Sequence, residues 1–210
     1  MRSVRVFLAL LVSACLITPA AARQAPPYRI LISNDDGVRA AGLAALAQIL
    51  QAIGQVIVVA PADNQSGKGH SITIAEPIFR EDLTLPNGLK AIGLTATPAS
   101  TVKVALNNIV TPKPDLVVAG INRGYNLGLS AYVSGTVGAA REAAMAGIPA
   151  IAASTAVDVN DWGFAAEEVL GVARRVKQYG LPPQTFLNVN VPPPPSGDAK
   201  GYRVTTQAMT

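Results

Sequence analysis

Two adjacent carboxylates are the residues of this sequence best suited to metal chemistry. Asp35 and Asp36 follow directly after the apolar segment 29–33. Anions held this close repel each other unless a cation lies between them. Mg²⁺ and Mn²⁺ prefer carboxylate, amide and hydroxyl oxygens, and Ser66 and Asn122 could supply the neutral ones. The pair therefore predicts one divalent metal ion, Mg²⁺ or Mn²⁺, beside which either carboxylate could accept a proton from water.

The same stretch also has a purely structural interpretation. Asn34–Gly37, Asn-Asp-Asp-Gly, has the composition of an Asx-type turn that caps the helix after it. The loop alone does not separate a metal site from such a turn, so both interpretations stay open. If the loop does form a site, Asn34 is a possible substrate contact.

A second polar segment has the composition of a phosphate-binding site. Ser134, Gly135 and Thr136 precede an alanine-rich helix, where free N–H groups and the positive end of the helix dipole can hold a phosphate. The alternative is an ordinary serine or threonine N-cap. Ser66 and Gly67 form a similar candidate, because a glycine lets the backbone approach a phosphate closely.

Two rings are candidates for contact with a substrate. His70, the single histidine of the chain, follows the loop that holds Ser66 and could bind phosphate or carry a proton. A structural histidine at the start of a strand is the alternative. Tyr125 follows the segment of Asn122 and could stack on a base, or could simply belong to a surface loop.

The composition excludes several other classes of site. The chain of 210 residues has one cysteine and one histidine, which excludes a disulfide framework, a thiolate zinc site and a histidine-rich zinc centre. Half of the residues are apolar, as in a globular protein with a sizeable core. Without residues 1–22 the chain has 15 basic and 13 acidic residues, so no binding to nucleic acid is expected.

The first 22 residues have the pattern of a secretory signal peptide. Two arginines precede the apolar segment 6–17, and a run of small residues ends at Ala22, the expected cleavage position. Residues 12–15 offer an alternative, a lipobox in which Cys15 is lipidated and anchors the protein to a membrane. Both interpretations predict export, to a bacterial periplasm, and a single domain over residues 23–210.

Alternating apolar segments indicate the elements that position these residues. The expected strands are 29–33, 55–60, 71–74, 89–94, 115–119, 150–154 and 186–191, and the expected helices are 43–53, 98–109, 136–146 and 161–179. Turns are expected over 76–88, and 201–210 looks like the beginning of a strand. Alternating strands and helices predict an α/β fold, a mostly parallel sheet covered on both faces.

The strand order along the chain explains why the candidate residues should meet. In open parallel sheets, ligands bind outside the carboxyl ends of the strands. The loops 34–37, 60–67 and 120–126 all follow predicted strands. We therefore expect the two carboxylates, the Ser66 loop and Asn122 at one edge of the sheet.

Six blocks of this sequence resemble the SurE family, the stationary-phase survival nucleotidases. They are ILISNDDG, VVAPADNQSGKGHSIT, ATPASTVKVAL, DLVVAGINRGYNLG, SGTVGAAREAAMAGIPAIAAS and FLNVNVP, and they stand in the order and spacing of the family over nearly all of residues 29–191. The resemblance implies a Rossmann-like α/β/α sandwich. It also implies a metal-dependent phosphomonoesterase of nucleoside 5′- and 3′-monophosphates, with short polyphosphate as a further substrate of some relatives.

The resemblance carries expectations about the site and the assembly. The metal ligands of the family align with Asp35, Asp36, Ser66 and Asn122, as the residue types alone had suggested. Family members form homodimers or tetramers through a C-terminal extension. The sequence ends at Thr210, where the family continues for several tens of residues, so the extension is apparently missing and the same assembly is doubtful.

The sequence departs from the family at one further place. It has Ala96–Thr101, Ala-Thr-Pro-Ala-Ser-Thr, where the family usually has Gly-Thr-Pro-Ala-Asp-Cys. The loss of an acid and a thiol affects either local packing or contacts with a substrate. The alternative to an enzyme is an exported nucleotide- or phosphate-binding protein with little or no turnover.

Overall fold

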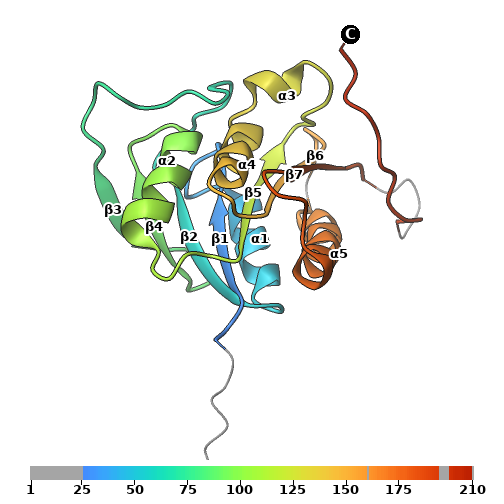
Figure 1. Ribbon diagram of the computed structural model, residues 1–210, viewed down its shortest axis with the longest axis horizontal. Helices are drawn as coiled ribbons and strands as arrows, with labels where there is room; N and C mark the ends of the chain where they lie inside the picture. Colours follow the sequence, from blue (N-terminus) through green and yellow to red (C-terminus); the bar gives the residue numbers. More distant parts are fainter. Residues whose placement is uncertain (1–25, 160, 194–198, 210) are drawn as a thin grey trace, which may run out of the picture.

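The computed structural model describes residues 26–159, 161–193 and 199–209, and the expected signal peptide and Cys15 lie outside them. Within these residues a seven-stranded sheet has the order β3-β4-β2-β1-β5-β6-β7, in which only β3 is antiparallel to its neighbour (Figure 1). The strands are β1 (Arg29–Ser33), β2 (Gln55–Pro61), β3 (Arg80–Thr84), β4 (Lys90–Leu94), β5 (Leu116–Arg123), β6 (Ala150–Thr155) and β7 (Phe186–Val191). The described helices include none that is both long and apolar enough to cross a membrane.

Helices cover both faces of this sheet. They are α1 (Ala41–Leu50), α2 (Pro98–Val104) with the π-helical turn η1 (Ala105–Ile109), α3 (Ser130–Val133), α4 (Gly135–Met145) and α5 (Gly163–Tyr179). α1 and α5 lie on one face, and α2, η1 and α4 lie on the other (Figure 1). The predicted α/β/α sandwich is confirmed.

The central strand β1 shows why the sheet is buried on both faces. Ile30 and Ile32 belong to the core beneath α1 and α5, whereas Leu31 belongs to the core beneath α2 and α4. Successive side chains of a strand point to opposite faces, so a strand between two layers of helices must be apolar throughout. β1 pairs in parallel with β2 on one side and with β5 on the other.

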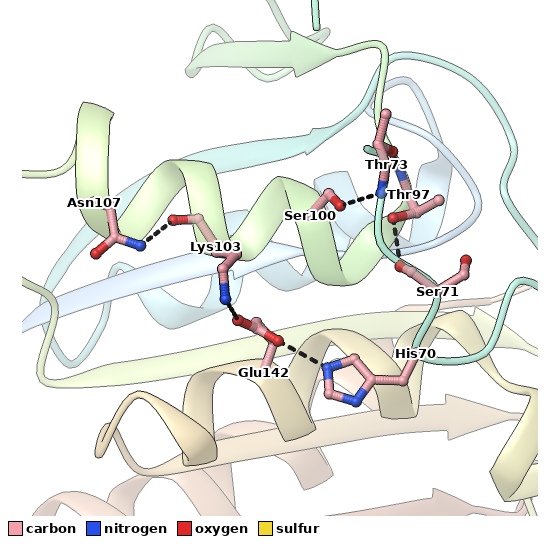
Figure 2. A network of polar contacts seen from close by, with 8 residues as sticks. All are labelled: His70, Ser71, Thr73, Thr97, Ser100, Lys103, Asn107 and Glu142. Atoms are coloured by element: carbon pink, nitrogen blue, oxygen red, sulfur yellow. Dashed lines mark hydrogen bonds and ion pairs between the residues drawn. The ribbon is translucent and has the colours of Figure 1, made fainter. Parts of the chain in front are cut away.

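Two predictions about the region between β2 and α2 were wrong. Residues 71–74 form a loop rather than a strand, because side chains near the start of α2 satisfy their backbone (Figure 2). The amide of Thr73 donates to the hydroxyl of Ser100 at 2.7 Å, and the hydroxyl of Thr97 donates to the carbonyl of Ser71 at 2.6 Å. The strand in this region is instead β3, inside the stretch 76–88 that was expected to form turns.

The end of the chain and β5 also differ from expectation. Residues 201–209 form no strand, and β5 continues beyond the predicted 115–119 as far as Arg123. The register between β5 and β6 shifts between Ala119 and Asn122. Asn122 therefore lies on the strand itself and not in the loop after it.

Candidate active site

The first carboxylate, Asp35, is held by the start of α4. The hydroxyl of Thr136 donates to Oδ1 of Asp35, and the backbone amides of Gly135 and Thr136 also donate to this carboxylate. A Cβ on Gly135 would lie 2.7 Å from Cβ of Asp35, so only glycine permits this approach. Burial raises the pKa of Asp35, and the hydrogen bonds from Thr136 and Gly135 offset part of this rise.

The second carboxylate, Asp36, lies against β5. The backbone amide of Arg123 donates to it. Burial, and then the charge of Asp35, raise the pKa of Asp36 to about 6. A buried carboxylate whose charge raises the pKa of the carboxylate beside it forms, with that neighbour, a site that a divalent cation would stabilise.

Ser66 is positioned through its neighbours in the loop after β2. The amide of Gln65 donates to the backbone carbonyl of Asp35 at 2.7 Å, so the loop lies beside the first carboxylate. The amide of Ser66 donates to Oδ1 of Asn64 at 2.9 Å. Ser66 is exposed, as is Gly67, which has a φ of 75°. The Ser66 hydroxyl thus belongs to a loop that is hydrogen-bonded to the backbone of Asp35.

Asn122 precedes the residue whose amide contacts Asp36. Its side-chain nitrogen donates to the carbonyl of Gly124 at 2.6 Å. Because this contact uses the nitrogen, Oδ1 is the atom left to accept a hydrogen bond or bind a cation. Ser66 and Asn122 are therefore each next in sequence to a residue whose amide donates to Asp35 or Asp36.

The donor set fits a hard divalent cation. Over the described ranges, no three residues of His, Cys, Asp and Glu come together. A metal ion at this edge of the sheet would thus use two carboxylates together with amide and hydroxyl oxygens. These are the donors that Mg²⁺ and Mn²⁺ accept.

The other candidate residues lie where the structural interpretations of the sequence had placed them, at an N-cap, in a turn and in a surface loop. Ser134 is the N-cap of α4 and accepts from the amide of Val137 at 3.2 Å. Asn34 is buried, and its side chain closes the turn by donating to the carbonyl of Gly37 at 2.9 Å. Tyr125 is an exposed residue after β5. Phosphate binding at Ser134–Thr136 stays a prediction, because in this structure two amides of that segment contact Asp35.

Comparison with known proteins extends this picture. A family model described as survival protein SurE matches residues 30–210. The chain belongs to the SurE family. The relative named 5′-nucleotidase SurE from Geotalea daltonii is 44% identical over 181 residues, which cover 85% of this chain and 71% of the relative. The relative of the same name from Chlorobaculum tepidum is 41% identical, with 86% and 69% covered.

A solved structure of the SurE family agrees with the fold. The SurE protein from Aquifex aeolicus superposes with a TM-score of 0.75 at 38% identity, over 86% of this chain and 72% of that one. The recognition made from the six sequence blocks is therefore confirmed.

Ser100 and Thr101, where the sequence departs from the family pattern, both lie buried in α2. Ser100 accepts the hydrogen bond from Thr73 and so holds the loop 71–74 on α2. Thr101 is fully buried, and its hydroxyl has no hydrogen-bond partner among the described residues. Neither side chain has a hydrogen bond to Asp35 or Asp36.

Two buried polar residues, Glu142 and Asn126, hold loops near the site and were not among the residues predicted from the sequence. Glu142 of α4 contacts both His70 and Lys103. Asn126 donates to the hydroxyl of Ser154 at 2.8 Å, and its backbone contacts the asparagines of β7, so it holds the loop after β5. Glu142 could have been found because it lies four residues after Gly138, on the buried stripe of α4.

Proposed function

We propose that this protein hydrolyses nucleoside 5′-monophosphates to nucleoside and phosphate. One observation carries the proposal. The adjacent carboxylates Asp35 and Asp36 follow β1 and are hydrogen-bonded by the neighbours of Ser66 and Asn122, in a chain whose relatives are named 5′-nucleotidases. Activity on 3′-monophosphates and on short polyphosphate is a further part of the proposal. Both substrates carry a terminal phosphate that a cation held by the same residues could bind.

Four residues would hold a divalent cation, namely Asp35, Asp36, Ser66 and Asn122. When bound, such an ion supplies Lewis-acid chemistry, in which a phosphate oxygen is polarised and the pKa of a water is lowered. Asp36 is half-buried, and burial together with the charge of Asp35 raises its pKa to about 6, which suits a proton acceptor near neutral pH. Asp35 is the more rigid of the two, because Thr136 and Gly135 hold its carboxylate.

The chain also supplies groups that can orient the phosphate. The exposed Ser66–Gly67 segment presents backbone at the edge of the sheet, and Gly67 has room around its Cα for a close approach. Amides aimed at a phosphate stabilise charge that grows in the transition state. Tyr125 is exposed in the loop after Asn122, where a ring can stack on a base.

Phosphate release from the purified chain tests this proposal. The substrates are AMP, 3′-AMP and tripolyphosphate, each assayed with Mn²⁺, with Mg²⁺ and with EDTA. Asp36→Asn should abolish release, whereas the matched variant Glu167→Gln, at an exposed position of α5, should retain it. Metal-dependent release that Asp36→Asn leaves intact would refute the assigned site.

The alternative is a binding protein with the same donors and no turnover. Calorimetric titration of the folded chain with AMP in the presence of Mn²⁺ separates the two functions. Binding without phosphate release would favour the binding protein. Release at a rate that saturates with AMP would favour the enzyme.

A further inference from the structure

A buried carboxylate outside the metal-site candidates calls for an explanation. Glu142 of α4 is 6% exposed, and Asp35 is the other buried carboxylate among the described residues. A buried charge is costly unless each of its oxygens has a partner. Oε1 of Glu142 accepts from Nζ of Lys103 at 2.9 Å, and Oε2 lies 2.8 Å from Nε2 of His70 (Figure 2).

These contacts keep Glu142 ionised. Burial raises the pKa of Glu142, but the hydrogen bonds from Lys103 and His70 outweigh this effect and lower it. An ionised carboxylate only accepts hydrogen bonds, so Nε2 of His70 must carry a hydrogen. Figure 2 shows Nδ1 on the side of the ring away from Glu142.

His70 is joined to the loop that carries Ser66. The amide of Gly69 donates to the carbonyl of Val133 at 2.8 Å, directly before α4. A Cβ on Gly138 would lie 2.2 Å from the carbonyl oxygen of Gly69, so the loop rests on the surface of α4. The loop after β2 is therefore attached to α4 and to the residue before its N-cap through two adjacent residues, Gly69 and His70.

The same helix holds the first carboxylate of the site. Thr136, in the first turn of α4, donates to Asp35, and Glu142 lies six residues later, about 9 Å along the helix axis. α4 is thus one rigid element that sets the position of Asp35 at its start and of His70 further along. A shift of His70 relative to α4 would also shift the Ser66 loop relative to Asp35.

We propose that Glu142 is a positioning residue for phosphate-ester hydrolysis and acts through His70. By accepting from Nε2 it fixes the imidazole in the Nε2–H form and holds the Ser66–His70 loop on α4, beside the helix start that binds Asp35. Lys103 neutralises the other oxygen of Glu142. This inference rests on the proposed function and adds the group that orients the loop and its histidine.

The single histidine makes a direct test possible. In the tag-free, ¹⁵N-labelled chain every imidazole signal comes from His70. Long-range ¹H–¹⁵N spectra at about pH 8, where imidazole is ordinarily neutral, report which nitrogen carries the hydrogen. We expect the Nε2–H form in the unmodified chain, and a mixture of both forms in Glu142→Gln. The Nδ1–H form in the unmodified chain would overturn the proposal, even if every variant failed to fold.

Kinetics then separate positioning from a merely structural role. Glu142→Gln should lower kcat/KM for AMP about 10- to 100-fold, the usual effect of losing a residue that orients a functional group. The double variant His70→Ala/Glu142→Gln should be no worse than His70→Ala, because Glu142 acts through the ring. Additive losses, or an unchanged kcat/KM in Glu142→Gln, would overturn the proposal.

Two further variants serve as controls. Lys103→Met removes the ion pair but not the contact with His70, so it should lower the melting temperature and leave the Nε2–H form in place. Glu167→Gln should change neither property. If the unmodified chain releases no phosphate from AMP, the proposed function fails, while the spectra still decide whether Glu142 fixes His70.

Discussion

Thr136→Val removes one hydroxyl group and tests whether Thr136 holds Asp35 in place. Valine keeps nearly the same shape but cannot donate to Oδ1 of Asp35. Thr136 is 0% exposed and Asp35 is 3% exposed, so water cannot easily replace the lost donor. A hydrogen bond to a charged group contributes about 1.5–3 kcal/mol. We expect the free energy of unfolding to fall by about that amount.

The chain contains a matched control at Thr101. This residue is also 0% exposed, but its hydroxyl has no partner among the described residues. An unpaired buried hydroxyl costs about 1–3 kcal/mol, so Thr101→Val should leave the stability unchanged or raise it. The same chemical change is therefore expected to have opposite effects at the two positions.

Thermal unfolding in EDTA measures both variants. A domain of this size loses about 2–4 °C of melting temperature for each kcal/mol, so Thr136→Val should melt roughly 3–12 °C lower than the unmodified chain. Thr101→Val should melt at the same temperature or slightly higher. Equal losses in the two variants would refute the assignment of Thr136, because the cost would then come from the substitution of any buried threonine.

Three more outcomes can be measured. The pKa of Asp36 is raised from 3.8 to about 6 by burial and by a neighbouring carboxylate, so the metal-free folded chain holds this proton more tightly than the unfolded chain. The contribution of Asp36 to stability is therefore complete below pH 3.8 and is lost as the pH rises through about 6. Asp36→Asn should remove this part of the pH dependence of the melting temperature. Gly138→Ala would place a Cβ 2.2 Å from the carbonyl oxygen of Gly69, and we expect a loss of about 1–3 kcal/mol in urea unfolding despite the better helix propensity of alanine. Expression of all 210 residues in a bacterium should yield a periplasmic protein with the intact mass of residues 23–210, whereas a lipid-modified mass that Cys15→Ser abolishes would establish the anchored form.

The parallel character of the sheet and its burial on both faces followed from local sequence. β1 and β5 are continuous apolar segments, and such segments alternating with helical patterns form parallel sheets buried on both faces. The edge at which the site lies followed from the same pattern, because the polar loops come after the carboxyl ends of strands. Local pattern and chain direction were sufficient for both.

Local pattern was not sufficient where the partners of the backbone lie far away in the chain. The segment 71–74 has the residue types of a strand, but Thr97 and Ser100 provide its hydrogen bonds and leave it a loop. β3 has a charged sequence, REDLT, and forms a strand because β4 pairs with it in antiparallel register. β-Propensity is weak enough for such tertiary contacts to override it.

The sequence by itself determined the kinds of group that can meet at the edge of the sheet and the family to which they belong. Only the tertiary structure decided which atoms pair. Thr136 and Asp35 are 101 residues apart in sequence and share a buried hydrogen bond, and His70 and Glu142 are 72 residues apart. A hydrogen bond forms only within a few tenths of an ångström and a limited range of angles. That placement depends on how α4 packs against β5, β6 and the loop after β2, which no local segment specifies.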